Sequence, residues 1–231
     1  MEFKTTVDIK ASNYKITHQQ NILLLGSCFS DNIGEKFVEG GFCATVNPLG
    51  TLYNPASIAS AITQCDSRKD KRTPEFFNWL HSKADLSLLT ADKLMLEDTD
   101  TLIITFGTSW IYRLRENNMI VANCKKQPDR LFLRECLSSQ QIIDSWASLI
   151  EEKTRQRLHI IFTVSPIRHK KDGFHQNQIS KANLLIAIDR LCQMYPDQCE
   201  YFPSYEIMMD ELRDYRFYAD EQHLNLNFLH G

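Results

Sequence analysis

The sequence lacks both a long apolar run and a strong excess of charge of either sign. Its 26 Lys and Arg residues nearly balance 29 Asp and Glu residues, which gives a formal net charge of -3. We therefore expect no broad cationic surface and no nucleic-acid partner. No apolar run approaches the ~20 residues of a membrane-spanning helix, and residues 1–10 lack the apolar centre of a secretory signal. No membrane partner is expected, and the sequence does not indicate an oligomeric state.

Cysteines at metal-ligand spacing are also missing. The seven cysteines are an odd number and lie apart, without CxxC pairs, so we expect neither a disulfide framework nor a zinc site. No G-x-G-x-x-G sequence follows the first apolar run, which argues against a bound dinucleotide. We predict reduced thiols in a cytoplasmic protein, with no metal and no organic cofactor.

Internal repeats, low-complexity segments and Pro/Gly/Ser-rich linkers are absent, so the sequence predicts one domain over residues 1–231. Within it, short runs rich in Ile, Leu, Val, Thr and Phe alternate with segments of helical periodicity. The strand candidates are residues 22–25, 42–46, 102–106, 159–164 and 200–202. The helix candidates are residues 31–39, 55–64, 139–156, 178–195 and 204–212. Repeated strand–helix units predict an α/β fold, a three-layer α/β/α sandwich with a doubly wound, mostly parallel five-stranded sheet of flavodoxin-like type.

Two segments depart from this alternation. Residues 112–122 carry Glu116-Asn117-Asn118 at their centre, which indicates a β-hairpin inserted after the third strand. Residues 68–98 have little periodicity, and we expect them to run over the surface. Chemistry in an open α/β sheet collects at the carboxyl ends of the strands, and the candidate site residues follow those ends.

A serine directly follows the first strand. Gly26 permits a sharp turn, and Ser27 then stands where a helical pattern begins. Free backbone N–H groups and the positive end of the helix dipole favour a developing oxyanion there, so Ser27 is a candidate nucleophile. The alternative is that Ser27 only caps the helix, a position that serine favours.

The end of the chain supplies a possible acid–base pair. Asp220 precedes His223 by three residues, and an Asp so placed can orient the imidazole toward a nucleophile. The alternative is an exposed polar turn. A serine after the first strand and an Asp–His pair after the last favour the catalytic interpretation.

At this point the sequence resembles a known family. Residues 26–29, Gly-Ser-Cys-Phe, resemble the signature of the GSCFA family, a branch of the SGNH (GDSL-type) hydrolase superfamily. Further segments are similar to the family's other motifs, in the family's order, from about Asn21 to His223. These segments are residues 47–55, 106–110, 164–169 and 201–218.

The resemblance implies roles for individual residues. Ser27 matches the nucleophile, and its own N–H is one oxyanion donor. Gly50 matches the glycine that lends a second N–H, and Asp220 and His223 match the acid–base pair. The third donor, an asparagine in typical SGNH enzymes, is replaced by Ser109, whose hydroxyl donates but reaches less far than a carboxamide.

Three polar residues at other strand ends are candidates for substrate binding. Arg168 and His169 follow the fourth strand, and Asn47 follows the second. The Arg guanidinium suits an anionic or carbohydrate substrate; the alternative is a capped strand end with solvated cations. Cys28 is interpreted as a small buried residue, and Trp110 and Tyr112 as packing residues of the hairpin.

The C-terminal segment departs from the family pattern. Leu224 replaces the proline usual after the histidine, and family members normally continue beyond the position of Gly231; a truncated end and a divergent end are both open. The resemblance implies a serine hydrolase that deacylates an O-acylated small molecule or glycan through a Ser-His-Asp triad. The alternatives are O-acyl transfer to a carbohydrate and a non-catalytic carbohydrate- or ligand-binding module.

Overall fold

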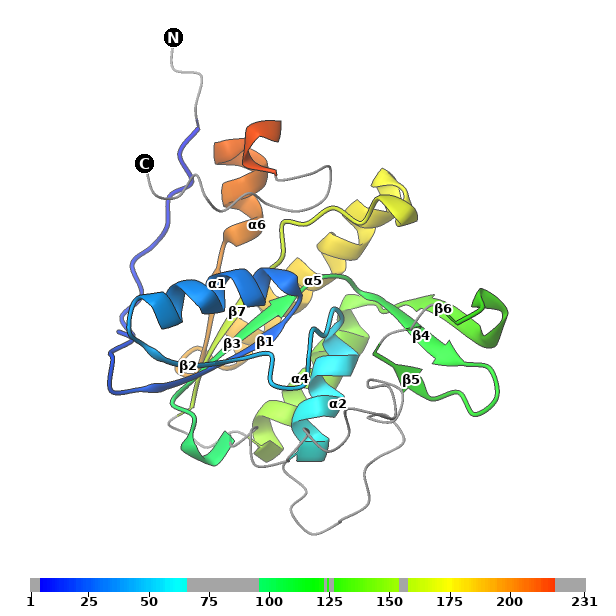
Figure 1. The fold of residues 1–231 in the computed structure, drawn as a ribbon, viewed down its shortest axis with the longest axis horizontal. Coiled ribbons are helices and arrows are strands. Elements are labelled where there is room, and N and C mark those ends of the chain that lie inside the picture. The colour runs from blue at the N-terminus through cyan, green and yellow to red at the C-terminus, as the bar shows by residue number, and fades with distance from the viewer. Residues whose placement is uncertain (1–4, 66–95, 123, 125–126, 154–157, 219–231) are drawn as a thin grey trace.

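The fold is built around one parallel sheet. The structure, a computed structural model, describes residues 5–65, 96–122, 124, 127–153 and 158–218. Five strands form the central sheet in the order β2-β1-β3-β7-β8, and every neighbouring pair is parallel (Figure 1). The strands are β1 (Asn21–Gly26), β2 (Cys43–Val46), β3 (Thr101–Phe106), β7 (His159–Val164) and β8 (Cys199–Phe202). All five predicted strands are confirmed, and the α/β class with them.

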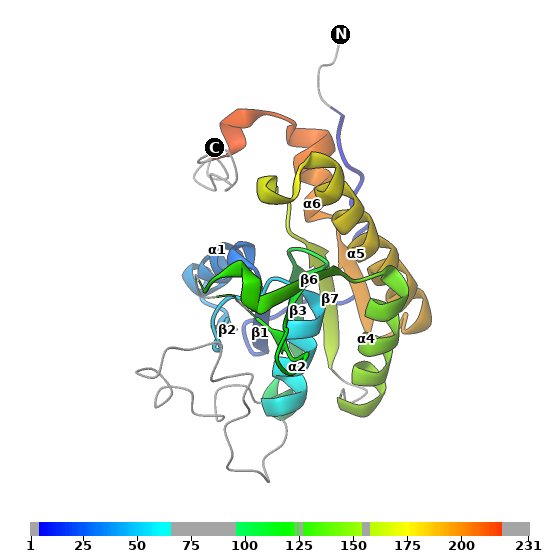
Figure 2. The same cartoon turned by 90° about the vertical axis from the view of Figure 1, so that its right-hand side faces the viewer.

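Helices cover both faces of this sheet, which makes the three layers. The helix α1 (Cys28–Glu39) lies on one face, whereas the other face carries α2 (Pro55–Cys65), α4 (Ser139–Lys153) and α5 (Phe174–Met194) (Figure 2). The side chains of β1 show why both faces are apolar. Ile22 and Leu24 pack toward α1, and Leu23 and Leu25 pack toward the other three helices, because successive side chains of a strand point to opposite faces.

A second, smaller sheet branches off between β3 and α4. Its strands β4 (Trp110–Leu114), β5 (Ile120–Val121) and β6 (Phe132–Cys136) are antiparallel in the order β5-β4-β6. We call this sheet the antiparallel arm (Figure 1). The predicted hairpin is confirmed as β4 and β5, while β6 was missed. Along β6 one buried residue is followed by two exposed and two half-buried ones, so the strand carries no clear period-two pattern.

The remaining elements are short. They are η2 (Leu96–Asp98), η3 (Asp129–Leu131), η4 (Lys170–Asp172), α6 (Ser204–Glu206), the π-helical η5 (Ile207–Leu212) and η6 (Tyr215–Phe217). The helix predicted over residues 204–212 is therefore one α-helical turn that continues as a wider π-helix. Of the surface excursion predicted over residues 68–98, residues 68–95 lie outside the described residues, and 96–98 form η2. Among the helices that the structure does describe, none has the length and apolarity needed to cross a membrane.

Candidate active site

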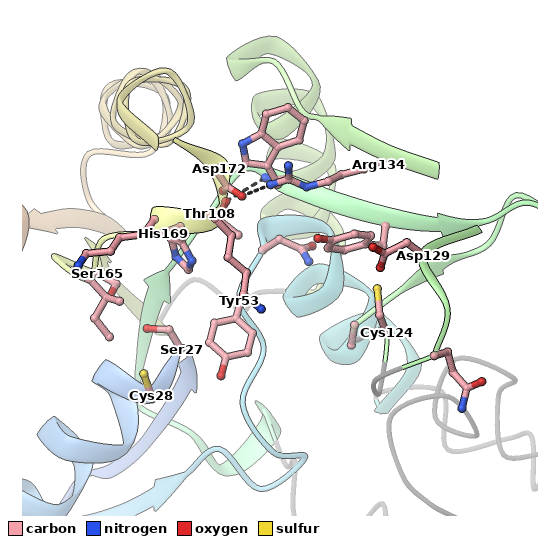
Figure 3. Close-up of a pocket in the computed structure, with 18 residues that line it drawn as sticks. Ser27, Cys28, Tyr53, Thr108, Cys124, Asp129, Arg134, Ser165, His169 and Asp172 are labelled. Atoms are coloured by element: carbon pink, nitrogen blue, oxygen red, sulfur yellow. Dashed lines mark hydrogen bonds and ion pairs between the residues drawn. The ribbon is translucent and has the colours of Figure 1, made fainter. Parts of the chain in front are cut away.

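A pocket of about 540 Å³ opens at the carboxyl ends of the central strands. Its lining falls into two groups that face each other (Figure 3). The sheet side follows β1, β3 and β7 and carries Ser27, Cys28, Thr108, Ser165 and His169. The arm side belongs to the antiparallel arm and the segments beside it, and carries Trp110, Tyr112, Cys124, Asp129 and Arg134. The sheet side of the pocket therefore lies where the sequence analysis expected the site, at the carboxyl ends of the strands.

The Gly26–Ser27 turn has the geometry of a constrained corner. Gly26 has φ +152°, and a Cβ there would lie 2.3 Å from the Thr105 carbonyl oxygen, so only glycine fits. Ser27 follows as the N-cap of α1, and its Oγ accepts a hydrogen bond from the Phe29 N–H at 3.3 Å. Ser27 therefore caps the helix and also lines the pocket, so the two interpretations of this serine are compatible.

Asn47, predicted to bind substrate, instead holds this corner. It is buried and is not among the residues that line the pocket. Its Oδ1 accepts a hydrogen bond from the Gly26 N–H at 2.9 Å, and its Nδ2 donates to Asp31 at 2.6 Å. Asn47 adopts φ 39°, a left-handed conformation that asparagine tolerates better than most residues. Its side chain thereby ties the end of β2 to the Gly26 turn and to α1.

The three predicted oxyanion donors do not meet in the pocket. The Ser27 N–H donates to the Thr105 carbonyl at 3.3 Å, and the Gly50 N–H donates to the Asn47 carbonyl at 2.8 Å. Ser109 is fully buried, and its Oγ bonds to Ser180 Oγ at 3.1 Å and to Cys136 Sγ at 3.2 Å. Neither Gly50 nor Ser109 is among the residues that line the pocket. Thr108, one residue earlier than Ser109, lines it instead.

Arg168 and His169 point to different cavities. His169 lines the main pocket, as predicted for a substrate-binding residue. Arg168 lines a separate cavity of about 130 Å³ beside Met208 and Arg213, where its guanidinium carbon lies 4.6 Å from the Tyr218 ring centroid. Adjacent residues of an extended segment point in opposite directions, so a sequence pair of this kind does not place both side chains in one site.

His169 is largely buried and sits at the sheet side of the pocket (Figure 3). Burial lowers the pKa of its imidazole from 6.5 to about 4; the Lys181 ammonium lowers it as well, whereas Asp172 and a backbone hydrogen bond with Gly107 raise it. The Nε2 atom is buried and has no hydrogen-bond partner among the described residues. With a pKa of about 4, the imidazole is uncharged at neutral pH.

Lys181, a buried lysine beside the pocket, is one of the residues that the sequence interpretation missed. It lies on α5 with 1% of its surface exposed. Its Nζ donates to the Gly107 carbonyl at 2.6 Å and to the Ser165 carbonyl at 2.5 Å. Burial lowers the pKa of this amine from 10.5 to about 7, whereas Cys28 raises it. A signal was available, because Lys181 interrupts the apolar stripe that continues through Leu184 and Ile188.

The arm side is built around one cation. Arg134 forms an ion pair with Asp172, and its guanidinium carbon lies 4.1 Å from the Trp110 ring centroid and 5.8 Å from that of Tyr112. Stacking and ion pairing together hold a guanidinium in a defined orientation. Trp110 and Tyr112 line the pocket, which the interpretation of both as hairpin packing residues did not anticipate.

Two predicted catalytic residues lie outside the described residues, namely Asp220 and His223. Their position relative to Ser27 stays a prediction. In the part of the chain that the structure describes, no three His, Cys, Asp or Glu side chains gather so that they could hold a metal ion.

Comparison with known families gives one match. The model of the GSCFA family matches residues 21–227, which includes every strand of both sheets. No curated protein matches the chain. No solved structure matches it either.

Proposed function

The chain belongs to the GSCFA family, and we propose that it is a serine hydrolase that acts on ester bonds. The observation that carries the proposal is the placement of Ser27. It stands at the N-terminus of α1, on a corner that only glycine can form, and it lines a pocket large enough for a small ester. A serine presented at a sharp strand-to-helix turn is the arrangement that acyl-transfer enzymes use for their nucleophile.

In the proposed reaction Ser27 Oγ forms a bond to the acyl carbon of the ester. The hydroxyl proton passes to His223, which Asp220 orients, and then to the alcohol oxygen as the ester C–O bond breaks and the alcohol leaves. Water then attacks the acyl-serine, gives its proton to the same base, and releases the acid while Ser27 recovers its hydroxyl hydrogen. Both partners come from the resemblance to the SGNH superfamily.

The oxyanion donors need a different assignment from the one that the family pattern implies, since Gly50 and Ser109 do not line the pocket. We assign the role to the N-terminal end of α1. The Cys28 N–H is the first of the helix, and the first N–H groups of an α-helix have no acceptor within it. The helix dipole adds positive potential at the same end.

The test is turnover of an activated ester together with covalent trapping. We expect the chain to hydrolyse p-nitrophenyl acetate and to be labelled at Ser27 by a fluorophosphonate, located by peptide mass spectrometry. The same assay with added glycan acceptors separates hydrolysis from O-acyl transfer, because transfer produces an acylated sugar in place of free acid.

Variants of His223 and His169 test which histidine acts as the general base. His223→Gln should abolish turnover, whereas His169→Gln should weaken substrate binding and leave labelling by the fluorophosphonate measurable. If the chain is inactive and a version with a longer family-type C-terminal segment is active, the catalytic assignment survives. If neither version turns over an ester or is labelled, the pocket is a binding site and the hydrolase proposal is wrong.

A further inference from the structure

The charged groups that line the pocket lie away from Ser27. The sheet side carries no charge at neutral pH, because burial raises the pKa of the Cys28 thiol and the pKa of His169 is about 4. The charged residues among the described lining belong to η3, β6 and η4, and they are Arg134, Lys170, Lys171, Asp129 and Asp172. Three cations against two carboxylates make this region positive, although the whole chain has a formal net charge of -3.

Arg134 is the accessible partner of its ion pair with Asp172. The pair leaves 34% of the arginine side chain exposed but only 10% of the aspartate side chain. The hydrogen bond to Asp172 is donated by Nη2, and a guanidinium has five N–H groups arranged in a planar fork. A ligand that enters the pocket therefore meets the guanidinium, with N–H groups beyond the one that Asp172 engages, and is largely shielded from the carboxylate.

The guanidinium is also held in a fixed orientation. Its carbon lies 4.1 Å from the Trp110 ring centroid, and Arg134 stands directly opposite Tyr112 in the pairing of β4 with β6. A guanidinium that is already fixed by a ring and a carboxylate loses little conformational freedom when it binds an anion. Arg168, which the sequence analysis suggested for an anionic substrate, lines a separate cavity, so Arg134 is the arginine that the pocket offers for this role.

Resting on the proposed serine-hydrolase function, we propose that Arg134 binds an anionic group on the alcohol part of the ester. The group is a carboxylate or a phosphate monoester, which share charged oxygens that match the guanidinium fork. Ser27 and Arg134 lie on opposite sides of the pocket (Figure 3), so the anion is remote from the reacting bond. We assign it to the alcohol because a pocket of about 540 Å³ holds far more than a short acyl group. Exposed Lys171 on η4 adds positive potential on the same side.

The experiment compares aryl acetates that differ in one substituent of the alcohol. The probes are 4-acetoxybenzoate, 4-acetoxyphenyl phosphate and 4-acetoxybenzamide, an uncharged ester with nearly the shape of the benzoate. For the whole chain, KM for the better of the two anionic esters should be about 10-fold lower than KM for the amide, because a hydrogen bond to a charged group is stronger than a neutral one. The lower KM of the two anions then identifies a carboxylate or a phosphate. Equal KM values for all three esters would overturn the proposal.

Variants then test whether Arg134 carries the preference. Arg134→Met should reduce it to about twofold or less, since the charge and the fork are both removed. Arg113→Met is the matched control and should keep the full preference, because Arg113 pairs with Glu135 on the same sheet without lining the pocket. A purely structural Arg134 would lower the melting temperature of Arg134→Met and leave the preference unchanged, and that result would contradict the proposal.

If Arg134→Met does not fold, Asp172→Asn decides. It removes the carboxylate that competes for the guanidinium, so the preference for the anion should rise about threefold; an unchanged preference would overturn the proposal.

Calorimetric binding of the alcohols alone separates this inference from the proposed function. If 4-hydroxybenzoate or 4-hydroxyphenyl phosphate binds more tightly than 4-hydroxybenzamide, yet no ester is hydrolysed and no fluorophosphonate label appears, anion recognition stands and the hydrolase function falls. If all three esters are hydrolysed with the same KM, the function stands and the role of Arg134 falls.

Discussion

The two sides of the pocket are held in place by different means. On the sheet side, backbone groups make the contacts: Gly26 forms a sharp corner before Ser27 at the N-terminus of α1, and the His169 N–H donates to Asn177 Oδ1. Beside them, Lys181 bridges the Gly107 and Ser165 carbonyl oxygens. On the arm side, a long side chain is held by other side chains, since Arg134 lies against Trp110 and pairs with Asp172. The rim of the arm is also more exposed, as at Asp129.

In the proposed function, the sheet side carries out the reaction and the arm side recognises the substrate. Reacting groups must stay within a fraction of an ångström of their productive geometry, and rigid strand ends supply that precision. Recognition tolerates adjustment, and stacked aromatic and guanidinium groups supply area and hydrogen bonds for a polar ligand. If the contrast is correct, changes on the sheet side should lower kcat and changes on the arm side should raise KM.

The largest effect should come from the nucleophile. Ser27→Ala should lower kcat for p-nitrophenyl acetate by on the order of 10³ to 10⁶-fold, because the acyl-enzyme can no longer form. Ser145→Ala, an exposed serine of α4, is the control and should keep full activity. Comparable rates for wild type and Ser27→Ala, with unchanged circular dichroism, would remove Ser27 from the reaction.

The corner beneath the nucleophile should be next. Gly26→Ala combines φ +152° with a Cβ only 2.3 Å from the Thr105 oxygen, so we expect a loss of about 2–4 kcal/mol in the free energy of unfolding. Gly41→Ala shares a positive φ of +79° but would meet only His18, at 3.8 Å, and should lose about 1 kcal/mol. Urea denaturation measures both, and equal losses would show that the close approach at Gly26 is unimportant.

On the arm side the expected change is in binding. Arg134→Met should raise KM about 10-fold for an ester with a bulky polar alcohol and change kcat less than about threefold, because the guanidinium is remote from the reacting bond. Arg113→Met is the matched control, as Arg113 pairs with Glu135 on the same sheet without lining the pocket. A fall in kcat with unchanged KM would place Arg134 on the chemical side and end the contrast.

The sequence predicted the scaffold better than the directions of its side chains. The central strands β1, β3 and β7 followed from nearly continuous apolar runs, because a strand buried on both faces leaves an unbroken signal. The edge strands β2 and β8 are less buried and gave weaker signals. The Gly26–Ser27 corner was predicted from the rule that chemistry collects at the carboxyl ends of the strands. Asn47, Gly50 and Ser109 were correctly placed at strand ends, yet none of them lines the pocket. Whether a residue at a strand end faces the cavity depends on tertiary hydrogen bonds, which local spacing does not encode.

Lys181 and Arg134 show two further limits. The lysine stands on the buried stripe of a long helix, and only contact with carbonyls from two other loops distinguishes it from a misplaced surface residue. The arginine belongs to β6, a strand with no clear alternation. Its stacking partner Trp110 lies opposite Cys136 across the arm. The contact between Arg134 and Trp110 can therefore be predicted only when the pairing of β4 with β6 is known.

The smallest effect should come from Cys28, the neighbour of the proposed nucleophile. It tests whether the reaction depends on Ser27 itself or on the residue next to it. Burial raises the pKa of its thiol above 9.0, and Asp31 raises it as well, so the thiol stays protonated at pH 7 and is a poor nucleophile. Cys28→Ser should therefore keep kcat within about twofold, since the proposed reaction runs through the Ser27 hydroxyl. Iodoacetamide at pH 7 should modify exposed Cys43 before Cys28, as peptide mass spectrometry can show. The opposite pattern, with Cys28→Ser inactive and Ser27→Ala active, would transfer the nucleophile's role from the serine to the cysteine.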